Sequence, residues 1–197
     1  NLEQLDLETP LSWLGRLPKL LEHRRRRNST EQSPDNIHAH YDLGNPLYRL
    51  FLDDTMTYSC ALYQTPEDTL EQAQCNKLDR LFDLLELNEG DHLLDIGCGW
   101  GGMALHLARR AGVEVLGITL SEEQLALARK RAAQANLSNQ VRFELADYRD
   151  LEGEFDRVVS VGMFEHVGAP HFVEFFQTVN RLLKDNGVAL LHSIGRM

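Results

Sequence analysis

The 197-residue chain contains no apolar run approaching the ~20 residues of a membrane-spanning helix, and no segment with the pattern of a signal peptide. Its three cysteines, Cys60, Cys75 and Cys98, form no CxxC pair. An odd number of unpaired cysteines argues against a zinc site or a disulfide framework and favours a reducing compartment. We therefore expect a cytoplasmic protein without a metal site.

Positive charge is scarce as well, because 20 Lys and Arg stand against 30 Asp and Glu and give a formal net charge of −10. Such a chain repels a phosphate backbone except at a local basic patch, so we expect no nucleic-acid partner. The hydrophobic content of 43% is ordinary for a globular protein, and the length suits one α/β domain with an appendage. The sequence begins at Asn1 and ends at Met197 after an apolar segment, so we expect both ends to be cut from a larger protein.

The densest basic cluster, Arg24 to Arg27, follows a segment (residues 11–23) whose apolar residues recur at helical spacing. Two interpretations remain open. The segment is a helix packed on a preceding domain, or it is an apolar face that lies on an anionic membrane. Residues 28–36 are polar and typical of a linker. Residues 1–36 are thus predicted to be the end of an N-terminal domain plus a linker.

A glycine-rich stretch, Leu93 to Gly102, organises the rest of the chain. It predicts a buried strand, a tight turn and the start of a helix, in which free backbone N–H groups point at a ligand. The spacing Gly-x-Gly-x-Gly is not the six-residue dinucleotide fingerprint. It favours a mononucleoside ligand, whose polar groups Asp95 can accept from.

Helical and strand patterns alternate regularly around this stretch. They predict a doubly wound, mostly parallel α/β sheet. Ser121 and Gln124 form a capping-box pattern, and Asn186-Gly187 predicts a turn before the last strand. The expected helices are 69–87, 103–111, 121–136 and 171–183, and the expected strands are 93–96, 113–118, 141–146, 156–161 and 188–193. Residues 37–88 are predicted to be a helical cap, and residues 89–197 a Rossmann-like core whose last strands are missing.

Polar side chains follow the carboxyl ends of the predicted strands, which meet at one edge of a parallel sheet. No acidic residue ends the second strand, which counts against a nicotinamide enzyme. The polar residues are Thr119, Gln124, Asp147, Tyr148, Arg149, Glu165, His166 and His192.

The predicted cap also concentrates polar groups in two places, residues 40–45 and residues 58–60. By themselves they suit a cap that covers the sheet, with its tyrosines as packing. Cys60 has no base beside it in the sequence, so a cysteine nucleophile is not expected. The residues are His40, Tyr41, Asp42, Asn45, Tyr58, Ser59 and Cys60.

Six motifs in order, between about His38 and Gly195, closely resemble those of cyclopropane-fatty-acyl-phospholipid synthases, which are class I S-adenosylmethionine-dependent methyltransferases. The first 36 residues match only in general character. The motifs are Asp95-Ile96-Gly97-Cys98-Gly99-Trp100-Gly101-Gly102, His40 to Asn45, Tyr58-Ser59-Cys60, Asp147 to Asp150, Gly162 to Gly168 and Leu191 to Gly195.

The resemblance implies a role for each part of the site. Gly97 and Gly99 hold the methionine part of S-adenosylmethionine, and Tyr58 and Ser59 close over it. Thr119 and Gln124 contact the ribose, and Asp147 and Tyr148 lie near the adenine. A bicarbonate ion is surrounded by Cys60, Glu165, His192 and Ile194, with Val161 nearby. A further tyrosine that the family uses at this anion is expected beyond Met197.

The implied reaction adds a methylene group to the cis double bond of an unsaturated phospholipid acyl chain. A carbocation forms and loses a proton to bicarbonate, for which a dry apolar channel and nearby aromatic faces are needed. The implied location is the inner face of the membrane, as a peripheral protein, with a homodimer as a possible assembly. Two alternatives remain. One is a methyltransferase that adds a methyl branch to an acyl chain or methylates a small amine, and the other is a non-catalytic lipid- or cofactor-binding module.

Overall fold

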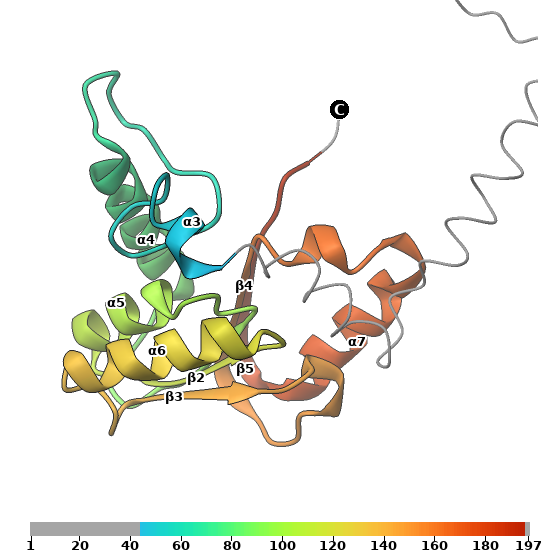
Figure 1. The fold of residues 1–197 in the computed structure, drawn as a ribbon. Helices are drawn as coiled ribbons and strands as arrows, with labels where there is room; N and C mark the ends of the chain where they lie inside the picture. The colour runs from blue at the N-terminus through green and yellow to red at the C-terminus, as the bar shows by residue number, and fades with distance from the viewer. Residues whose placement is uncertain (1–43, 196–197) are drawn as a thin grey trace, which may run out of the picture.

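The computed structural model describes residues 44–195, and these form an open sheet of five parallel strands with helices on both faces (Figure 1). The strand order is β3-β2-β1-β4-β5. The chain thus runs outward from β1 to one edge and then returns to build the other half, so the predicted doubly wound fold is confirmed. The strands are β1 (His92–Ile96), β2 (Glu114–Thr119), β3 (Val141–Leu145), β4 (Phe155–Val161) and β5 (Leu183–His192).

The helices divide between the two faces of the sheet according to their apolar residues. One buried cluster joins α4, α5 and α6 to one face, and a second joins α7 to the other. The helices are α3 (Asn45–Tyr48), α4 (Leu70–Leu85), α5 (Gly102–Ala111), α6 (Glu122–Gln134) and α7 (Phe172–Leu182). Short 3₁₀ turns, η1 (Tyr148–Asp150), η2 (Phe164–His166) and η3 (Ala169–His171), follow β3 and β4.

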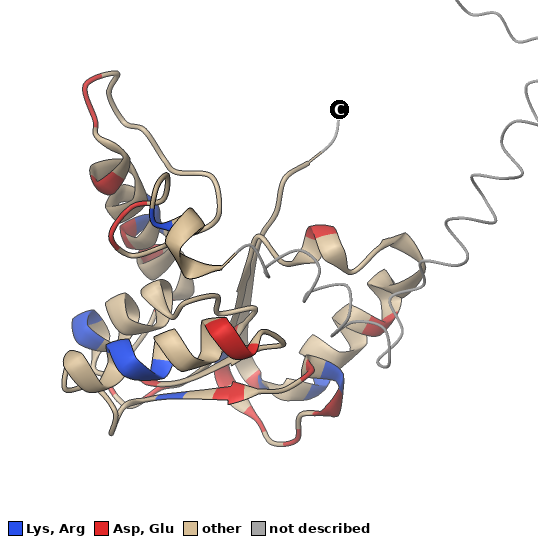
Figure 2. Cartoon of the chain, in the orientation of Figure 1, with Lys and Arg blue, Asp and Glu red and all other residues tan. Residues whose placement is uncertain are grey.

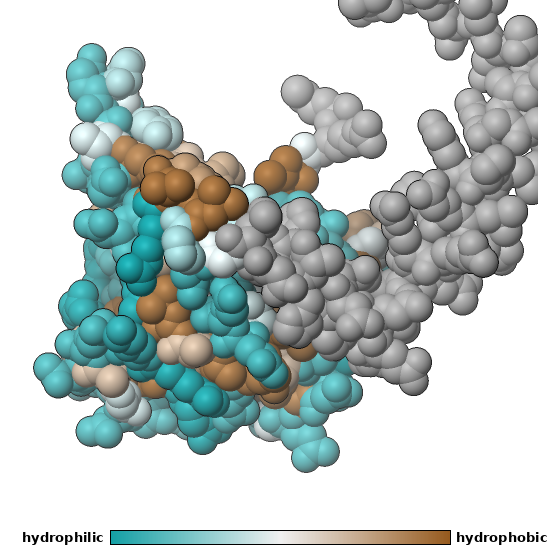
Figure 3. Space-filling view, in the orientation of Figure 1, coloured by the Kyte–Doolittle hydropathy of each residue, from teal (hydrophilic) through white to brown (hydrophobic). Residues whose placement is uncertain are grey.

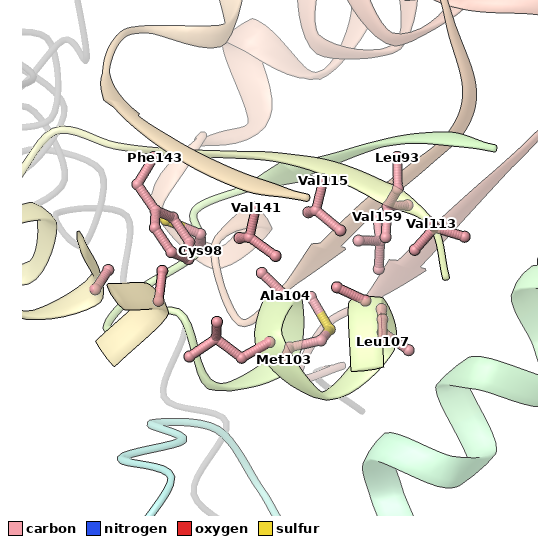
Figure 4. Packing of buried hydrophobic residues seen from close by; sticks show 14 of the residues in the cluster. Leu93, Cys98, Met103, Ala104, Leu107, Val113, Val115, Val141, Phe143 and Val159 are labelled. Carbon is pink, nitrogen blue, oxygen red and sulfur yellow. The ribbon is translucent and has the colours of Figure 1, made fainter. Parts of the chain in front are cut away.

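The larger core lies between the sheet and the helices α4, α5 and α6, and Figure 4 shows its part around α5. Met103, Ala104 and Leu107 recur on one side of α5 and face Val115 and Val141 of the sheet. Successive strand residues point to opposite faces, so Leu93 enters this core while Leu94 enters the core under α7. The central strand β1 is buried on both faces, as is typical of a parallel sheet, whereas the edge strands β3 and β5 are partly exposed.

The predicted helix starts are confirmed at their caps. The hydroxyl of Thr69 accepts from the Gln72 N–H at the start of α4, and that of Ser121 accepts from the Gln124 N–H at the start of α6. The reciprocal half of the capping box is wrong, because the Gln124 side chain accepts from the Thr119 hydroxyl at 2.7 Å. The Ser121 N–H donates instead to the Thr119 Oγ1.

The predicted turn at Asn186-Gly187 is also wrong, since β5 already begins at Leu183. The pairing of β4 with β5 shifts register there, because Phe155 pairs with Leu183 and Arg157 pairs with Val188. The extra residues bulge out of the ladder, and a Cβ at Gly187 would lie 2.6 Å from the Leu183 side chain. The glycine therefore permits a bulge rather than a turn.

The predictions for residues 1–36 and for His40, Tyr41 and Asp42 lie outside the described residues. Within the described part, no helix is both long and apolar enough to cross a membrane. Acidic and basic residues are interspersed over the helices in the view of Figure 2. The division into a cap (37–88) and a core (89–197) stays a prediction.

Candidate active site

A cavity of about 390 Å³ lies at the carboxyl ends of β1, β2 and β4, where the sequence predicted a ligand site. Its volume falls within the ~300–1,000 Å³ typical of small-molecule sites. The lining comes from the loop before α4, from α4 itself, from the glycine turn and from the residues that follow β2, β3 and β4. These include Met56, Tyr58, Ser59, Lys77, Asp95, Gly97, Gly99, Thr119, Gln124, Asp147, Tyr148, Arg149, Val161 and Met163.

The glycine turn approaches the cavity closely because Gly97 and Gly99 lack side chains. Gly97 has φ 82°, and a Cβ there would lie 2.9 Å from the Met163 side chain, whereas a Cβ at Gly99 would enter open space. The expectation of free N–H groups is wrong for two positions. The N–H groups of Gly97 and Cys98 donate to the Ile118 carbonyl at 3.0 and 2.9 Å, which fixes the turn to β2.

Asp95 is the second-to-last residue of β1, just before the glycine turn, and is 0% exposed. Neither carboxylate oxygen has a hydrogen-bond partner among the described residues. Burial raises the pKa of Asp95 to about 7, because the charged form is desolvated. A buried carboxylate without a partner needs a donor from elsewhere. The cavity therefore fits a ligand that brings a cationic donor, such as the ammonium group of S-adenosylmethionine.

Thr119 and Gln124 form a neutral pair at the end of β2. Both are buried, and the Thr119 hydroxyl donates to Gln124 Oε1 at 2.7 Å and accepts from the Ser121 N–H at 3.1 Å. The predicted neighbours of the ribose are thus held together by their own hydrogen bonds. Their position after β2 is the one that an acidic residue takes in dinucleotide-binding folds.

Asp147 and Tyr148 follow β3, and Arg149 largely neutralises the charge there. Nε and Nη2 of Arg149 donate to the two oxygens of Asp147 at 2.9 and 2.6 Å. The Tyr148 ring packs edge-on against Phe175 at 5.3 Å, and burial raises the pKa of Tyr148 to about 12. This end of the cavity therefore offers a flat aromatic wall and a paired carboxylate.

The loop before α4 supplies Tyr58 and Ser59, and α4 holds this loop through two residues that sequence reasoning missed. Gln74 Nε2 donates to the carbonyls of Thr57 and Ser59, and Lys77 Nζ donates to Ser59 Oγ at 2.6 Å. Both side chains are buried although they lie in an amphipathic helix. The only sequence signal was that two long polar side chains lie next to the predicted apolar stripe.

A second set of contacts fastens the same loop to the glycine turn. Arg131 of α6 donates to the carbonyls of Thr55 and Trp100 at 2.8 and 2.9 Å. The Trp100 indole N–H donates to Asn45 Oδ1 at 2.6 Å. Asn45, a predicted cap residue, is therefore hydrogen-bonded to the glycine turn. The Tyr48 ring contacts Tyr58 edge-on and Trp100 at a tilt, so an aromatic series joins the turn to the surface.

The predicted anion site lies beside the cavity, at the ends of β4 and β5. Cys60 Sγ lies 3.6 Å from His192 Nε2, and Glu165 Oε1 accepts from the Ile194 N–H at 2.7 Å. We call Cys60, Glu165, His192 and Ile194 the strand-end cluster. Of the predicted catalytic residues, only Val161 lines the cavity. Cys60 and Glu165 are exposed and Ile194 is 71% exposed, so within the described residues the cluster is open to water, unlike the dry site that the reaction implies.

An apolar surface lies next to the cavity on α3 and the following loop. Figure 3 shows it as a hydrophobic patch over the position of α3. Leu50 is 81% exposed, and Leu47, Phe51 and Tyr58 are partly exposed beside it. Phe51 contacts Tyr58, a residue of the cavity lining, with ring centroids 6.2 Å apart. The predicted packing role of the tyrosines is therefore incomplete, because about half of Tyr58 faces solvent.

The chain is similar to known proteins both in sequence and in structure. Residues 28–197 match a family model described as mycolic acid cyclopropane synthetase. The chain is 49% identical over 156 residues to the cyclopropane-fatty-acyl-phospholipid synthase of Escherichia coli K12, covering 79% of this chain and 40% of that protein. It is 46% identical over 172 residues to a probable fatty acid methyltransferase of Pseudomonas putida, covering 86% of this chain and 44% of that protein.

A solved structure of the mycolic acid cyclopropane synthase CmaA1, described as a complex with SAH and CTAB, superposes with a TM-score of 0.77 at 40% identity. The match covers 80% of this chain and 55% of that chain. The chain therefore spans less than half the length of the two relatives and about half of the solved protein.

Proposed function

Because the chain belongs to the mycolic acid cyclopropane synthetase family, we propose that it takes part in S-adenosylmethionine-dependent cyclopropanation of lipid acyl chains. The finer proposal is that a methylene group is added to the cis double bond of an unsaturated phospholipid. The observation that supports the cofactor part of the proposal is the buried Asp95, which has no partner among the described residues and lies just before a glycine turn that lines the cavity.

The residues of this chain suit each part of the cofactor. Asp95 accepts from the ammonium group, and the open space at Gly99 admits the methionine part. Thr119 and Gln124 face the ribose with neutral polar groups, and the Tyr148 ring gives the adenine an apolar wall. When bound, S-adenosylmethionine supplies an electrophilic methyl group on a sulfonium sulfur.

The acceptor half of the proposal rests on the apolar surface of α3 and on the aromatic series Tyr48, Phe51 and Tyr58. Leu47, Leu50 and Phe51 offer an acyl chain an apolar path from the surface to Tyr58, which lines the cavity. Aromatic faces also stabilise positive charge that develops near them. We propose that the protein acts at the surface of a membrane, on its cytoplasmic side, where such acyl chains are present.

Ring closure requires removal of one proton from the transferred methyl group, and the strand-end cluster is the proposed place of the base. His192 and Glu165 can hold a small anion such as bicarbonate, since the imidazole donates to it and the carboxylate accepts from its O–H group. The Ile194 N–H fixes the Glu165 carboxylate, and Cys60 contacts the His192 ring. In this arrangement the protein positions the base without placing a carboxylate of its own against the reacting carbon.

A deuterium experiment tests the proposal. The chain is incubated with S-adenosyl-(methyl-²H₃)-methionine and vesicles of a monounsaturated phospholipid, and the fatty acids are analysed by mass spectrometry. Ring formation removes one label from the methyl group, so the product keeps two deuterium atoms. A product that keeps all three and carries a methyl branch would overturn cyclopropanation, and the absence of any product together with tight SAH binding would favour a binding module.

Methyl branching is the second candidate, because the chain is 46% identical to a protein named as a probable fatty acid methyltransferase. The same incubation separates the two by whether the product carries a ring with two labels or a branch, identified by mass spectrometry of the fatty acids.

Bicarbonate and membrane binding have separate tests. If bicarbonate is the base, activity in CO₂-free buffer falls and is restored by added bicarbonate. If residues 1–30 contribute to docking, removing them weakens co-sedimentation with anionic vesicles. Equal activity in the two buffers, or equal co-sedimentation of the two chains, would exclude the respective role.

A further inference from the structure

We propose that Lys77 of α4 binds the carboxylate of the cofactor's methionine portion, directly or together with the Ser59 hydroxyl, and thereby selects ligands that carry a complete amino-acid end. Lys77 lines the cavity but has no part in the function proposed above. The inference deepens that function and depends on its cofactor.

The position of Lys77 is unusual for a lysine. Its side chain is 4% exposed in the middle of α4, and its ammonium donates to Ser59 Oγ at 2.6 Å. Within the described chain this is the single hydrogen bond of an ammonium group that has three donors. Burial lowers the pKa of Lys77 to about 8, and Cys60 and Asp53 offset that effect only in part. The group is therefore a buried cation that lacks a close anion.

The cavity lining also contains a buried group of the opposite charge, Asp95, that lacks a partner within residues 44–195. Asp95 is a buried carboxylate without a partner, and Lys77 is a buried ammonium with only a neutral partner. Both line the same cavity, yet they do not pair with each other. A zwitterionic ligand satisfies both at once, since its ammonium meets Asp95 and its carboxylate meets Lys77. The amino-acid end of S-adenosylmethionine is such a group, and its carboxylate is the only anion that the ligand has.

The other cationic side chain of the lining is already engaged. The guanidinium of Arg149 forms a two-point contact with Asp147, on the side of the cavity formed by the residues after β3. Of the two lining histidines, His171 contacts Glu174 at 3.2 Å, and His166 lies in the turn after β4. Lys77 is thus the permanent cation available to a ligand carboxylate. Its hydrogen bond also orients Ser59, whose own hydroxyl hydrogen can donate to the same carboxylate.

The test compares two ligands on two proteins by isothermal titration calorimetry. SAH carries the carboxylate, and 5′-(3-aminopropylthio)-5′-deoxyadenosine is the same molecule without it. We expect the wild-type chain to prefer SAH by about 30-fold, which corresponds to the ~2 kcal/mol of a charge-assisted contact. Lys77→Met should bind SAH about 30-fold more weakly and bind the decarboxylated ligand as the wild type does.

Gln74→Met is the matched control. Gln74 lies one turn away on α4, is equally buried and contacts the same loop, but it does not line the cavity. Gln74→Met should weaken the binding of both ligands equally and keep the wild-type preference for SAH. The thermal midpoint of Lys77→Met should not fall, because the change removes a desolvated charge.

Each outcome decides the inference. If Lys77→Met weakens both ligands alike, or keeps the preference for SAH, Lys77 has only a structural role and the inference is overturned while the cofactor assignment stands. If the wild type binds neither ligand, the proposed function and the inference fail together. If it binds both equally well, only the inference fails.

Discussion

The two halves of the candidate active site differ in how they are built. The cavity under the glycine turn is lined by two buried charges, and in the described part of the chain Asp95 has no partner and Lys77 only a neutral one. The strand-end cluster is largely exposed, and most of its polar groups contact each other, as Glu165 does with the Ile194 N–H, although His192 Nδ1 is buried without a partner among the described residues. Burial makes an unpaired charge costly, whereas water stabilises an exposed one. The cavity is therefore prepared for a specific ligand, and the cluster is suited to handle a proton or a small anion.

This difference has consequences for mutations. A change in the cavity alters ligand affinity and the pH dependence of stability together, because the same desolvated charge governs both. A change in the strand-end cluster alters turnover while binding and stability stay nearly constant. Four predictions test this separation.

Glu165→Gln should have the largest effect, a loss of turnover of about 10²–10³-fold, since the amide nitrogen that replaces the second carboxylate oxygen cannot accept from an anion's O–H group. The amide oxygen still accepts from the Ile194 N–H, so the local backbone is retained. The rate of labelled methyl transfer to phospholipid measures the effect. SAH affinity should stay within about twofold, and Glu152→Gln, at another exposed position, serves as the control. A parallel loss of SAH binding would show that the two regions are not separate.

Asp95→Asn should weaken SAH binding roughly 100-fold, because the ligand ammonium loses a buried carboxylate. The same change should stabilise the ligand-free protein at high pH. Burial raises the pKa of Asp95 to about 7, so the folded state keeps its proton at a pH where the unfolded state has lost it. The protonated Asp95 therefore contributes stability to the wild type. This contribution is complete below about pH 4 and is lost as the pH rises through 7, by up to about 4 kcal/mol.

Urea unfolding at pH 4.5 and pH 8 measures this second effect. The gain in the free energy of unfolding of Asp95→Asn over the wild type should grow between the two values. An equal difference at both would mean that Asp95 does not titrate as a buried group.

Gly99→Ala should weaken SAH binding about 10-fold by filling space in the cavity. Gly90 is the matched control, because both glycines have positive φ and a Cβ at either would meet no atom within 4 Å. Each substitution should cost about 1 kcal/mol of stability for the left-handed conformation. Only Gly99 lines the cavity, so Gly90→Ala should bind SAH as the wild type does. Similar SAH affinities for the two variants would place the ligand elsewhere.

Asn45→Ala should have the smallest effect, about 1 kcal/mol of stability, because it removes the bond from α3 to the Trp100 indole. Trp100→Phe removes the same bond from the other side, so a double-mutant cycle should give a coupling of about 0.5–1.5 kcal/mol. Additive effects would mean that this bond does not hold α3 against the glycine turn.

Much of the fold could be predicted from the sequence. The strand Leu93–Ile96, the glycine turn and the caps at Thr69 and Ser121 follow from local chemistry, and the structure confirms them. The helix predicted over 69–87 ends earlier, at Leu85, because Glu86 takes the left-handed conformation. The bulge at Gly187 was missed because a register shift depends on the neighbouring strand, which a local pattern does not contain.

The residues of the site also fall into two groups, those that the sequence predicted and those that only the structure revealed. The sequence by itself determined which residues end each strand, and parallel strands bring those ends to one edge, so Asp95, Thr119 and Asp147 were found. Only the tertiary structure decided which groups are buried without partners and which distant groups meet. Lys77 became a cavity residue because α4 packs beside the loop that carries Ser59, and Cys60 reached His192 across 132 positions. Desolvation and contact are properties of the packed chain, so no local pattern records them.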